Sequence, residues 1–252
     1  RAPLPHTPEP RGAERRGIPV IPRAEMLAES MRLKEGIAVA GSHGKTTTTS
    51  LVAHVLSCAG LVPTAVIGGR VFAPDTAPST TRLGAGDLLV AEADESDGSF
   101  LRLAPVVAVV TNIDPEHLVH YGSFEALQDA FASFANPVPF WGLSVLCLDH
   151  PGGQAIVPRM TRRTATYRFA SQADWVASQV RSEPPGTRFE VRRRSERLGE
   201  VRRRLPGRHN VLNALATLAV ADELGVPFAT AAGALEGFLG IERRFEAKGE
   251  RA

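Results

Sequence analysis

The feature that most constrains this chain is a glycine-rich turn between an apolar run and a helix-like segment. Ile37 to Ala40 are apolar, Gly41 ends the run, and Gly44-Lys45-Thr46 opens a segment that continues through Ser50. Small residues let backbone N–H groups face inward at such a turn, and the start of a helix adds the positive end of its dipole. The stretch predicts a cradle for nucleotide phosphates, with Lys45 near the outer phosphates and the Thr46 hydroxyl on Mg²⁺. The alternative is a glycine turn ahead of an ordinary helix.

Three short apolar runs are each followed by a polar cluster. The runs are Ile37 to Ala40, Asp87 to Ala91 and Val106 to Val110, and the clusters are Gly41 to Thr46, Glu92 to Asp97 and Asn112 to His117. Buried runs separated by helical stretches predict an α/β fold, a mostly parallel sheet with helices on both faces. Ligands of such sheets bind beyond the carboxyl ends of the strands. The three clusters are therefore expected at one edge, around one site.

The second cluster carries four carboxylates within six residues, and Glu92 is the one nearest the strand. A carboxylate in this place, downstream of a phosphate loop, suits a magnesium ligand. The alternative is an acidic loop kept soluble by its charges, but neighbouring carboxylates repel one another and a cation would relieve that repulsion. His117 taken alone would be a structural loop histidine, and its shared edge with Lys45 favours a metal or substrate role.

The second half of the chain has a different pattern. Alternating residues from about 165 to 206 predict a small antiparallel sheet appended to the parallel one. The arginines from Arg181 to Arg208 are diluted by glutamates and interleaved only with Phe189, so a solvated face is favoured over a nucleic-acid surface. His209, Asn210 and Asn213 then lie on the first turn of a strong helix, where side chains commonly meet a ligand; the alternative is plain N-capping by Asn210.

The composition is ordinary for a soluble globular protein. The chain has 252 residues, 43% of them hydrophobic and 22% charged, with a net charge of +2, and its two cysteines are far apart. No apolar run approaches the roughly 20 residues of a membrane helix, so no membrane partner and a cytoplasmic location are expected. Residues up to about Gly17 are expected to be irregular, and His54 is expected at the surface. The first residue is not methionine, so the chain is expected to be an internal piece of something longer.

Taken together, the motifs resemble those of the Mur ligase family. The matching stretches, in family order, are GSHGKTTTTS, AEADESDGSFL, VVTNIDPEHL, GRHNVLNALA and RRFEAKGE, and the similarity extends from about Gly17 to the end. Within the family the resemblance is to the bacterial members that add L-alanine to UDP-N-acetylmuramate. Ser96 stands where murein-peptide ligases usually carry tyrosine, and the helix before Asn136 lacks the lysine of later pathway enzymes.

The resemblance implies a domain organisation. Family enzymes have an N-terminal UDP-substrate domain, a central ATPase domain and a C-terminal domain. Residues 1–35 would be the tail of the first domain and a linker, residues 36–245 the central ATP-binding domain, and residues 246–252 the start of a linker to the third domain.

The resemblance also implies a reaction and a role for each motif. The substrate carboxylate attacks the γ-phosphate of ATP, and the amine of L-alanine displaces phosphate from the resulting acyl phosphate. Lys45 would hold the β- and γ-phosphates, Thr46 and Glu92 one Mg²⁺, and His117 a second metal. His209, Asn210 and Asn213 would border the adenine, and Arg244 would reach the γ-phosphate. The remaining ATP contacts would come from the loop and helix start: Gly41, Ser42, His43, Gly44 and Thr47.

Two residues depart from the family pattern: Ser42 replaces a threonine, and Val119 replaces an aspartate expected to support His117. The alternatives left open are a related amide ligase of the murein-peptide or folylpolyglutamate type, and a bare nucleotide-binding fragment. The sequence does not fix the oligomeric state.

Overall fold

The computed structural model describes residues 8–73, 76–184, 186–238 and 240. Its strands, in chain order, are β1 (Glu35–Ala40), β2 (Thr64–Ala73), β3 (Thr76–Arg82), β4 (Leu88–Glu92), β5 (Val107–Val110), β6 (Leu143–Cys147), β7 (Thr164–Arg168), β8 (Trp175–Glu183), β9 (Gly186–Arg193) and β10 (Glu196–Arg203). Its α-helices are α1 (Pro8–Arg15), α2 (Arg23–Arg32), α3 (Lys45–Cys58), α4 (Leu118–Tyr121), α5 (Phe124–Ala135), α6 (Pro151–Ile156), α7 (Arg208–Glu223) and α8 (Phe228–Gly237). Two short 3₁₀ helices are η1 (Ser99–Arg102) and η2 (Val157–Arg159).

The ten strands of the described residues form one sheet, in the order β10-β9-β8-β7-β6-β5-β1-β4-β2-β3. The strands from β2 through β8 in this order pair in parallel, whereas β2–β3, β8–β9 and β9–β10 are antiparallel. The mostly parallel sheet predicted from the sequence is confirmed. The strand β1 lies near the middle, between β4 and β5, so the loop that follows it opens at the centre of the carboxyl edge.

The sequence correctly predicted that antiparallel strands follow the parallel ones, but it predicted the wrong strand as the first of them. β7 was expected among them and instead pairs in parallel with β6 on one side and β8 on the other. Tyr167 is the register partner of both Cys147 and Trp175. The antiparallel part therefore starts at β8 and continues the main sheet.

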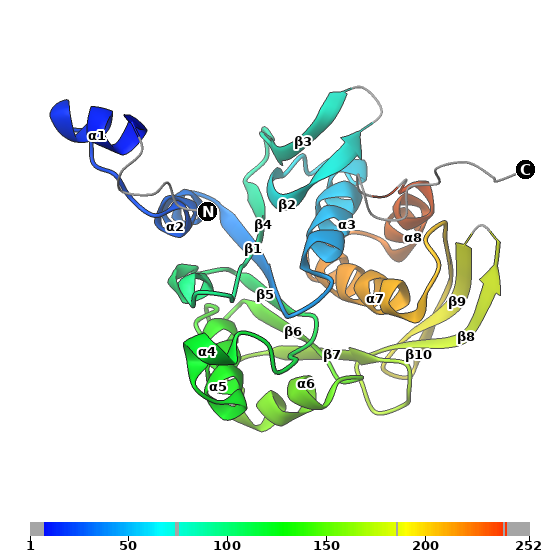
Figure 1. The fold of residues 1–252 in the computed structure, drawn as a ribbon. Helices are drawn as coiled ribbons and strands as arrows, with labels where there is room; N and C mark the ends of the chain where they lie inside the picture. The colour runs from blue at the N-terminus through cyan, green and yellow to red at the C-terminus, as the bar shows by residue number, and fades with distance from the viewer. Residues whose placement is uncertain (1–7, 74–75, 185, 239, 241–252) are drawn as a thin grey trace, which may run out of the picture.

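Helices cover both faces of the sheet. α3, α7 and α8 pack together on one face, and α5 and α6 lie on the other (Figure 1). Along β1, Ile37 and Val39 belong to the first core and Ala38 and Ala40 to the second. Because both faces are covered, the strand is apolar without alternation.

The segment before the sheet differs from expectation. It was expected to be irregular up to about Gly17, and the structure forms α1 over Pro8–Arg15. Among the described helices, none is both long enough and apolar enough to cross a membrane.

Candidate active site

The phosphate loop is the turn from Gly41 to Gly44, between β1 and α3. Gly41 has φ +134° and Gly44 has φ +84°, which are conformations that residues with a side chain rarely adopt. A Cβ atom at Gly41 would lie 2.1 Å from Oγ1 of Thr111, and one at Gly44 would lie 2.8 Å from Oδ1 of Asn213. Both glycines are thus required by backbone conformation and by close neighbours. Gly44 provides no side-chain cap to α3, so the loop and helix start present backbone groups to a ligand.

The loop is held by the segment that follows β5. The amide N–H groups of Ser42 and His43 donate to the carbonyl and the side-chain Oδ1 of Asn112, at 3.1 and 2.8 Å. The side-chain amide of Asn112 donates back to the carbonyl of His43 at 2.9 Å, and the hydroxyl of Thr111 donates to the same carbonyl. These bonds fix the loop without any ligand.

Lys45 lies across the loop. Its Nζ donates to the carbonyl of Gly41 at 2.6 Å and lies 2.9 Å from both carboxylate oxygens of Glu95. Glu95 is 1% exposed. Burial raises the pKa of the Glu95 carboxyl, and its hydrogen bond with Lys45 opposes that rise. A buried carboxylate therefore holds the lysine in place beside the loop.

Thr46 and Glu92 are brought together as predicted. The hydroxyl of Thr46 donates to Oε1 of Glu92 at 3.2 Å, and the amide of Gly68 donates to Oε2 at 2.8 Å. A hydroxyl oxygen and a carboxylate side by side form a donor set suited to Mg²⁺.

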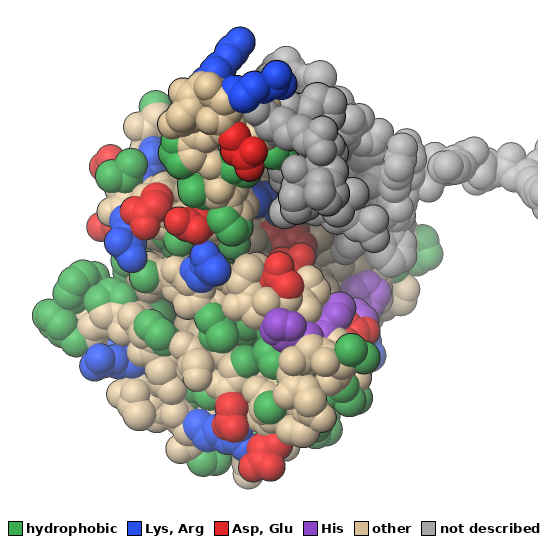
Figure 2. Space-filling view, turned by 60° about the vertical axis from the view of Figure 1, so that its left-hand side comes forward, with side chains coloured by type: hydrophobic (Ala, Val, Ile, Leu, Met, Phe, Trp, Pro, Cys, Tyr) green, Lys and Arg blue, Asp and Glu red, His purple; other side chains and the backbone are tan. Residues whose placement is uncertain are grey.

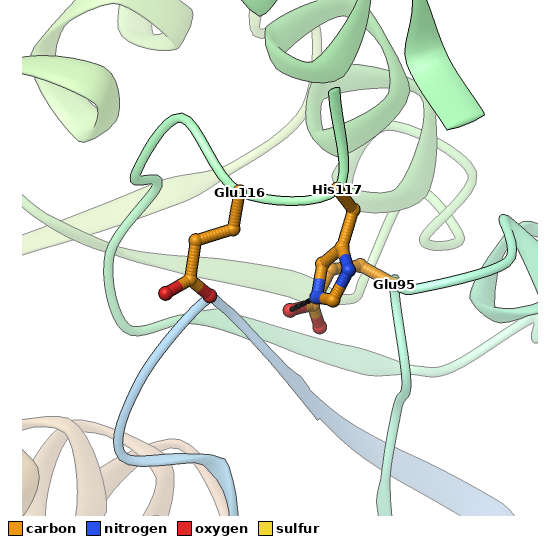
Figure 3. Close-up of side chains that lie close together, drawn as sticks. All are labelled: Glu95, Glu116 and His117. Carbon is orange, nitrogen blue, oxygen red and sulfur yellow. Dashed lines mark ion pairs between the residues drawn. The ribbon is translucent and has the colours of Figure 1, made fainter. Parts of the chain in front are cut away.

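His117 lies with two further carboxylates. One ligand atom from each of Glu95, Glu116 and His117 falls within 4.8 Å of the others. Figure 3 shows the three side chains converging from two loops, with Nε2 of His117 3.9 Å from Oε1 of Glu95. His117 has a left-handed backbone, φ 56°, at the start of α4, and it turns there toward Glu95.

Neither Glu95 nor Glu116 was predicted from the sequence as a site residue. Glu95 follows the end of β4 by three residues, and only the return of the chain after Glu92 carries it beneath Lys45. The other two carboxylates of that cluster act locally: Oδ1 of Asp94 accepts from the amide of Ser96, and Oδ1 of Asp97 from that of Ser99. A signal was present in Glu116, because it lies directly beside the predicted His117.

A second group of charges flanks the loop. Nε2 of His43 lies 3.5 Å from carboxylate oxygens of both Asp114 and Glu116, and Nε2 of His150 lies 2.8 Å from Asp114. The amide of Asp114 also donates to the hydroxyl of Ser42 at 2.8 Å. Figure 2 shows histidine side chains gathered beside acidic ones on one part of the surface. The segment after β5 that carries Asp114 and Glu116 therefore contacts the phosphate loop through both side chains and backbone.

The start of α7 reaches the loop through Asn213, whose side chain lies against Gly44. The alternative role of Asn210 as an N-cap is wrong, because Gly207 is the N-cap residue of α7. The side-chain amide of Asn210 instead donates to the carbonyl of Pro206 at 2.7 Å. Asn210 is buried and His209 is exposed.

Thr47 is buried in the first turn of α3. Val119 is 104% exposed on α4, so its side chain does not lie against His117. The predicted Arg244 lies outside the described residues.

Comparisons with known proteins agree on one family. The Mur ligase middle domain matches residues 39–221. UDP-N-acetylmuramate–L-alanine ligase of Sorangium cellulosum is 59% identical over 245 residues, 97% of this chain and 52% of that protein. The protein of the same name from Myxococcus xanthus is 56% identical over 243 residues, 96% of this chain and 51% of that protein. The chain thus spans about half the length of the curated relatives it matches.

Solved structures give the same result. The crystal structure of UDP-N-acetylmuramate-alanine ligase MurC from Thermotoga maritima has a TM-score of 0.81 at 29% identity, covering 97% of this chain and 54% of that one. UDP-N-acetylmuramate:L-alanyl-gamma-D-glutamyl-meso-diaminopimelate ligase from Neisseria meningitides has a TM-score of 0.79 at 29% identity, covering 92% and 75%.

Proposed function

The chain belongs to the Mur ligase family, and from that premise we propose that it is the ATP-binding part of a ligase joining L-alanine to UDP-N-acetylmuramate. The observation that carries the proposal is the arrangement of Lys45 against Glu95 and Thr46 against Glu92 at the carboxyl edge of one sheet. The names of the relatives supply the substrates. Residues 36–245 would be the central domain. Residues 1–35 would be the tail of the preceding domain and a linker, and residues 246–252 the start of a linker to the following domain. The proposal includes a cytoplasmic location in a bacterium, supported by the bacterial relatives.

The phosphates of ATP would lie on the Gly41–Gly44 loop and the first turn of α3. Lys45 supplies the positive charge, and its hydrogen bonds to the Gly41 carbonyl and to Glu95 hold it at the loop. Because the loop is already fixed by Asn112, little ordering is required when a nucleotide binds. His209, Asn210 and Asn213 would border the adenine, and Arg244 would reach the γ-phosphate.

Two groups of side chains fit divalent cations. Thr46 and Glu92 would hold one Mg²⁺, and Glu95, Glu116 and His117 would hold a second metal. The buried Glu95 supports this role, because its described side-chain partners are the ammonium group of Lys45 and the imidazole of His117. A bound Mg²⁺ supplies positive charge where a transferring phosphoryl group develops negative charge.

Amide formation requires that the substrate carboxylate first accept a phosphoryl group from ATP. An amine cannot displace oxide from a carboxylate, because oxide is too poor a leaving group. Transfer of the γ-phosphoryl group to the carboxylate of UDP-N-acetylmuramate gives an acyl phosphate and ADP. The amine of L-alanine then attacks the acyl carbon, the C–O bond to phosphate breaks, and the amine proton leaves as the amide forms. Lys45 would contribute by holding the phosphoryl oxygens during the first step.

A murein-peptide ligase is the second candidate, because the Neisseria structure is nearly as similar in fold as the Thermotoga one. Ser96 argues for the L-alanine enzyme. In the full-length protein, L-alanine is expected to support phosphate release with UDP-N-acetylmuramate, whereas L-alanyl-gamma-D-glutamyl-meso-diaminopimelate is not. The opposite preference would favour the second candidate.

The phosphate loop is tested by Lys45→Ala. Loss of a charged hydrogen-bond donor costs about 1.5–3 kcal/mol, so affinity for Mg²⁺–ATP should fall about 10- to 100-fold in calorimetry. The matched control is Lys34→Ala, which removes a lysine that donates to the carbonyl of Gly86. Equal affinities for the parent chain and Lys45→Ala would exclude this loop as the phosphate site.

The metal assignment is tested by Glu92→Gln. The variant should weaken the dependence of ATP binding on Mg²⁺ more than it weakens binding of metal-free ATP. Asp94→Asn is the control within the same cluster, because Asp94 is exposed and its Oδ1 serves a local turn. If Glu92→Gln and Asp94→Asn show the same magnesium dependence, Glu92 is not a ligand.

A further inference from the structure

The hydroxyl of Tyr121 joins the two loops that carry the proposed ligands of the second cation. It donates to the backbone carbonyl of Glu95, which precedes Tyr121 by 26 residues. Glu95 lies in the loop after β4, whereas Tyr121 is the last residue of α4, the short helix that follows β5. The bond therefore connects two separate loops at the carboxyl edge of the sheet, and the roles proposed above do not explain it.

The turn of helix that ends at Tyr121 begins at His117. The backbone amides of His120 and Tyr121 donate to the carbonyl of His117 at 2.9 and 3.3 Å. His117 is the N-cap residue of α4, and its Nε2 lies 3.9 Å from Oε1 of Glu95 (Figure 3). The hydroxyl of Tyr121 therefore fastens the turn that carries His117 to the loop that carries Glu95.

Tyr121 is also the residue that anchors α4. A helix of four residues is too short to be stable by itself. Leu118 and Val119 are exposed, whereas Tyr121 is half-buried and packs against the core on the α5 face of the sheet. Val119 stands where an aspartate was expected to support His117, and its side chain has no hydrogen-bonding group. The support for His117 therefore comes from the position two residues further on.

The loop of Glu95 lies directly against α4. Gly98 has φ +71°, and a Cβ atom there would lie 3.0 Å from Nε2 of His120 and 3.9 Å from the hydroxyl of Tyr121. The amide of Gly98 also donates to the carbonyl of Glu95 at 3.1 Å. Because that carbonyl keeps a partner, removal of the Tyr121 hydroxyl should loosen the connection to α4 without leaving the acceptor unpaired.

We propose that Tyr121 is a positioning residue for the second cation and holds Glu95 and His117 close enough to share it. Two donors bound to one Mg²⁺ at about 2.0–2.1 Å each can be no more than about 4.2 Å apart. The 3.9 Å between Nε2 of His117 and Oε1 of Glu95 is just inside that limit, so a small displacement of either loop would exclude a shared cation. This inference rests on the second cation of the proposed function, and it adds a residue that would not itself touch the metal.

The test measures Mn²⁺ binding to the 252-residue chain without nucleotide, from the loss of the electron paramagnetic resonance signal of free Mn²⁺. Mn²⁺ accepts the same kinds of ligand as Mg²⁺. All variants carry Glu92→Gln, so that the first proposed cation does not contribute. Tyr121→Phe keeps the ring and removes the hydroxyl. It should raise the Kd for Mn²⁺ about 2- to 12-fold, the effect of one hydrogen bond, and leave the number of binding sites unchanged.

Tyr167→Phe is the matched control, because Tyr167 is the other tyrosine of the chain. It is buried on β7 in the core on the opposite face of the sheet, so the same chemical change is made away from the cation ligands. This variant should bind Mn²⁺ with the Kd of the background. His117→Ala, which removes a proposed ligand, should lose more affinity than Tyr121→Phe. Urea unfolding of each variant records the change in stability separately from the change in metal affinity.

Two results would overturn the role of Tyr121 and leave the cation site in place. In the first, Tyr121→Phe keeps the Kd of the background although His117→Ala does not. In the second, Tyr121→Phe and Tyr167→Phe raise the Kd equally, which would make the effect one of general stability. Absence of Mn²⁺ binding by the background, or an unchanged Kd in His117→Ala, would instead remove the second cation from the proposed function, and the role of Tyr121 with it.

The full-length protein, with Glu92 restored, allows positioning to be separated from ligation. Phosphate release by Tyr121→Phe should return to the parental rate as Mn²⁺ is raised, because all the proposed ligands are still present. His117→Ala should remain slower at saturating Mn²⁺. A rate for Tyr121→Phe that stays low at saturating Mn²⁺ would contradict a role confined to positioning the cation ligands.

Discussion

At the scale of single residues, Gly44 combines two constraints that can be separated. Its φ is +84°, and a Cβ there would meet Asn213 at 2.8 Å. Gly60 has almost the same φ, +83°, and nothing within 4 Å of its Cβ position. Gly60→Ala therefore isolates the cost of the left-handed backbone, about 1–2 kcal/mol.

Gly44→Ala is expected to lower the free energy of unfolding by more than Gly60→Ala does, because the clash with Asn213 is added. Urea unfolding of both variants measures the difference. Asn213→Ala combined with Gly44→Ala should recover part of the excess, and the double-mutant cycle gives the coupling. Equal losses in the two glycine variants would mean that Asn213 moves aside without cost.

Individual site residues were predictable to different degrees. Lys45, Thr46 and Glu92 follow from local patterns, because each lies directly at the end of a strand or the start of a helix. Glu95 could not be found in this way, since its position beneath Lys45 depends on the path of the chain after β4. The sequence also does not show which side chain of an arginine-rich segment turns inward, as that of the buried Arg203 on β10 does.

At the scale of elements, His54 joins two helices on one face of the sheet. It was expected at the surface, but it is partly buried on α3, where its Nε2 lies 3.0 Å from the carbonyl of Ala234 on α8. Its ring also packs edge-on against Phe238 at 5.3 Å. The pattern of α3 did not reveal this contact, because α8 lies 180 residues further along the chain.

This contact predicts a pH dependence. Burial, chiefly, lowers the pKa of His54 below its ordinary 6.5. Above pH 6.5 the residue is neutral in both states and its full contribution is present. As the pH falls below 6.5, the unfolded chain takes up a proton that the folded chain does not, so stability is lost until the folded pKa is passed.

The parent chain should therefore lose more unfolding free energy between pH 8 and pH 5.5 than His54→Gln does. Urea titrations at a series of pH values measure this, with the exposed His120→Gln as control. Parallel pH profiles for the parent and His54→Gln would contradict the assignment.

Among the strands, those buried on both faces were predictable, and the edge strand β3 was not. β1, β4 and β5 are continuous apolar runs, which is the pattern of a covered parallel strand. β3, with the sequence TAPSTTR, is an edge strand that has no apolar pattern. β7 was placed in the wrong group because a short, mostly half-buried strand carries no sequence pattern that tells a parallel neighbour from an antiparallel one.

At the scale of the whole molecule, the chain matches about half of its relatives' length. Expressed as these 252 residues alone, it is expected to bind Mg²⁺–ATP but not to join L-alanine to UDP-N-acetylmuramate. Positioning of reactants supplies roughly 7–11 kcal/mol in such reactions, and the domain organisation proposed for this chain would leave the substrate-binding surfaces in the other domains.

Phosphate release in the presence of both substrates is the measurement, with a full-length relative as positive control. Robust release by the 252-residue chain that requires both substrates would contradict the three-domain organisation proposed for it.

The central place of β1 also determines how late in synthesis the strand can complete its pairing. Ile37 pairs with Val107, roughly 70 residues later, so β1 cannot complete its pairing until that much more chain has left the ribosome. At a translation rate of roughly 5–20 residues per second, β1 therefore remains without β5 as its neighbour for about 4–14 s. Its unpaired edge is open to other nascent chains during this interval. Slowed translation between β1 and β5 should therefore lower the soluble yield without changing a single contact of the finished fold.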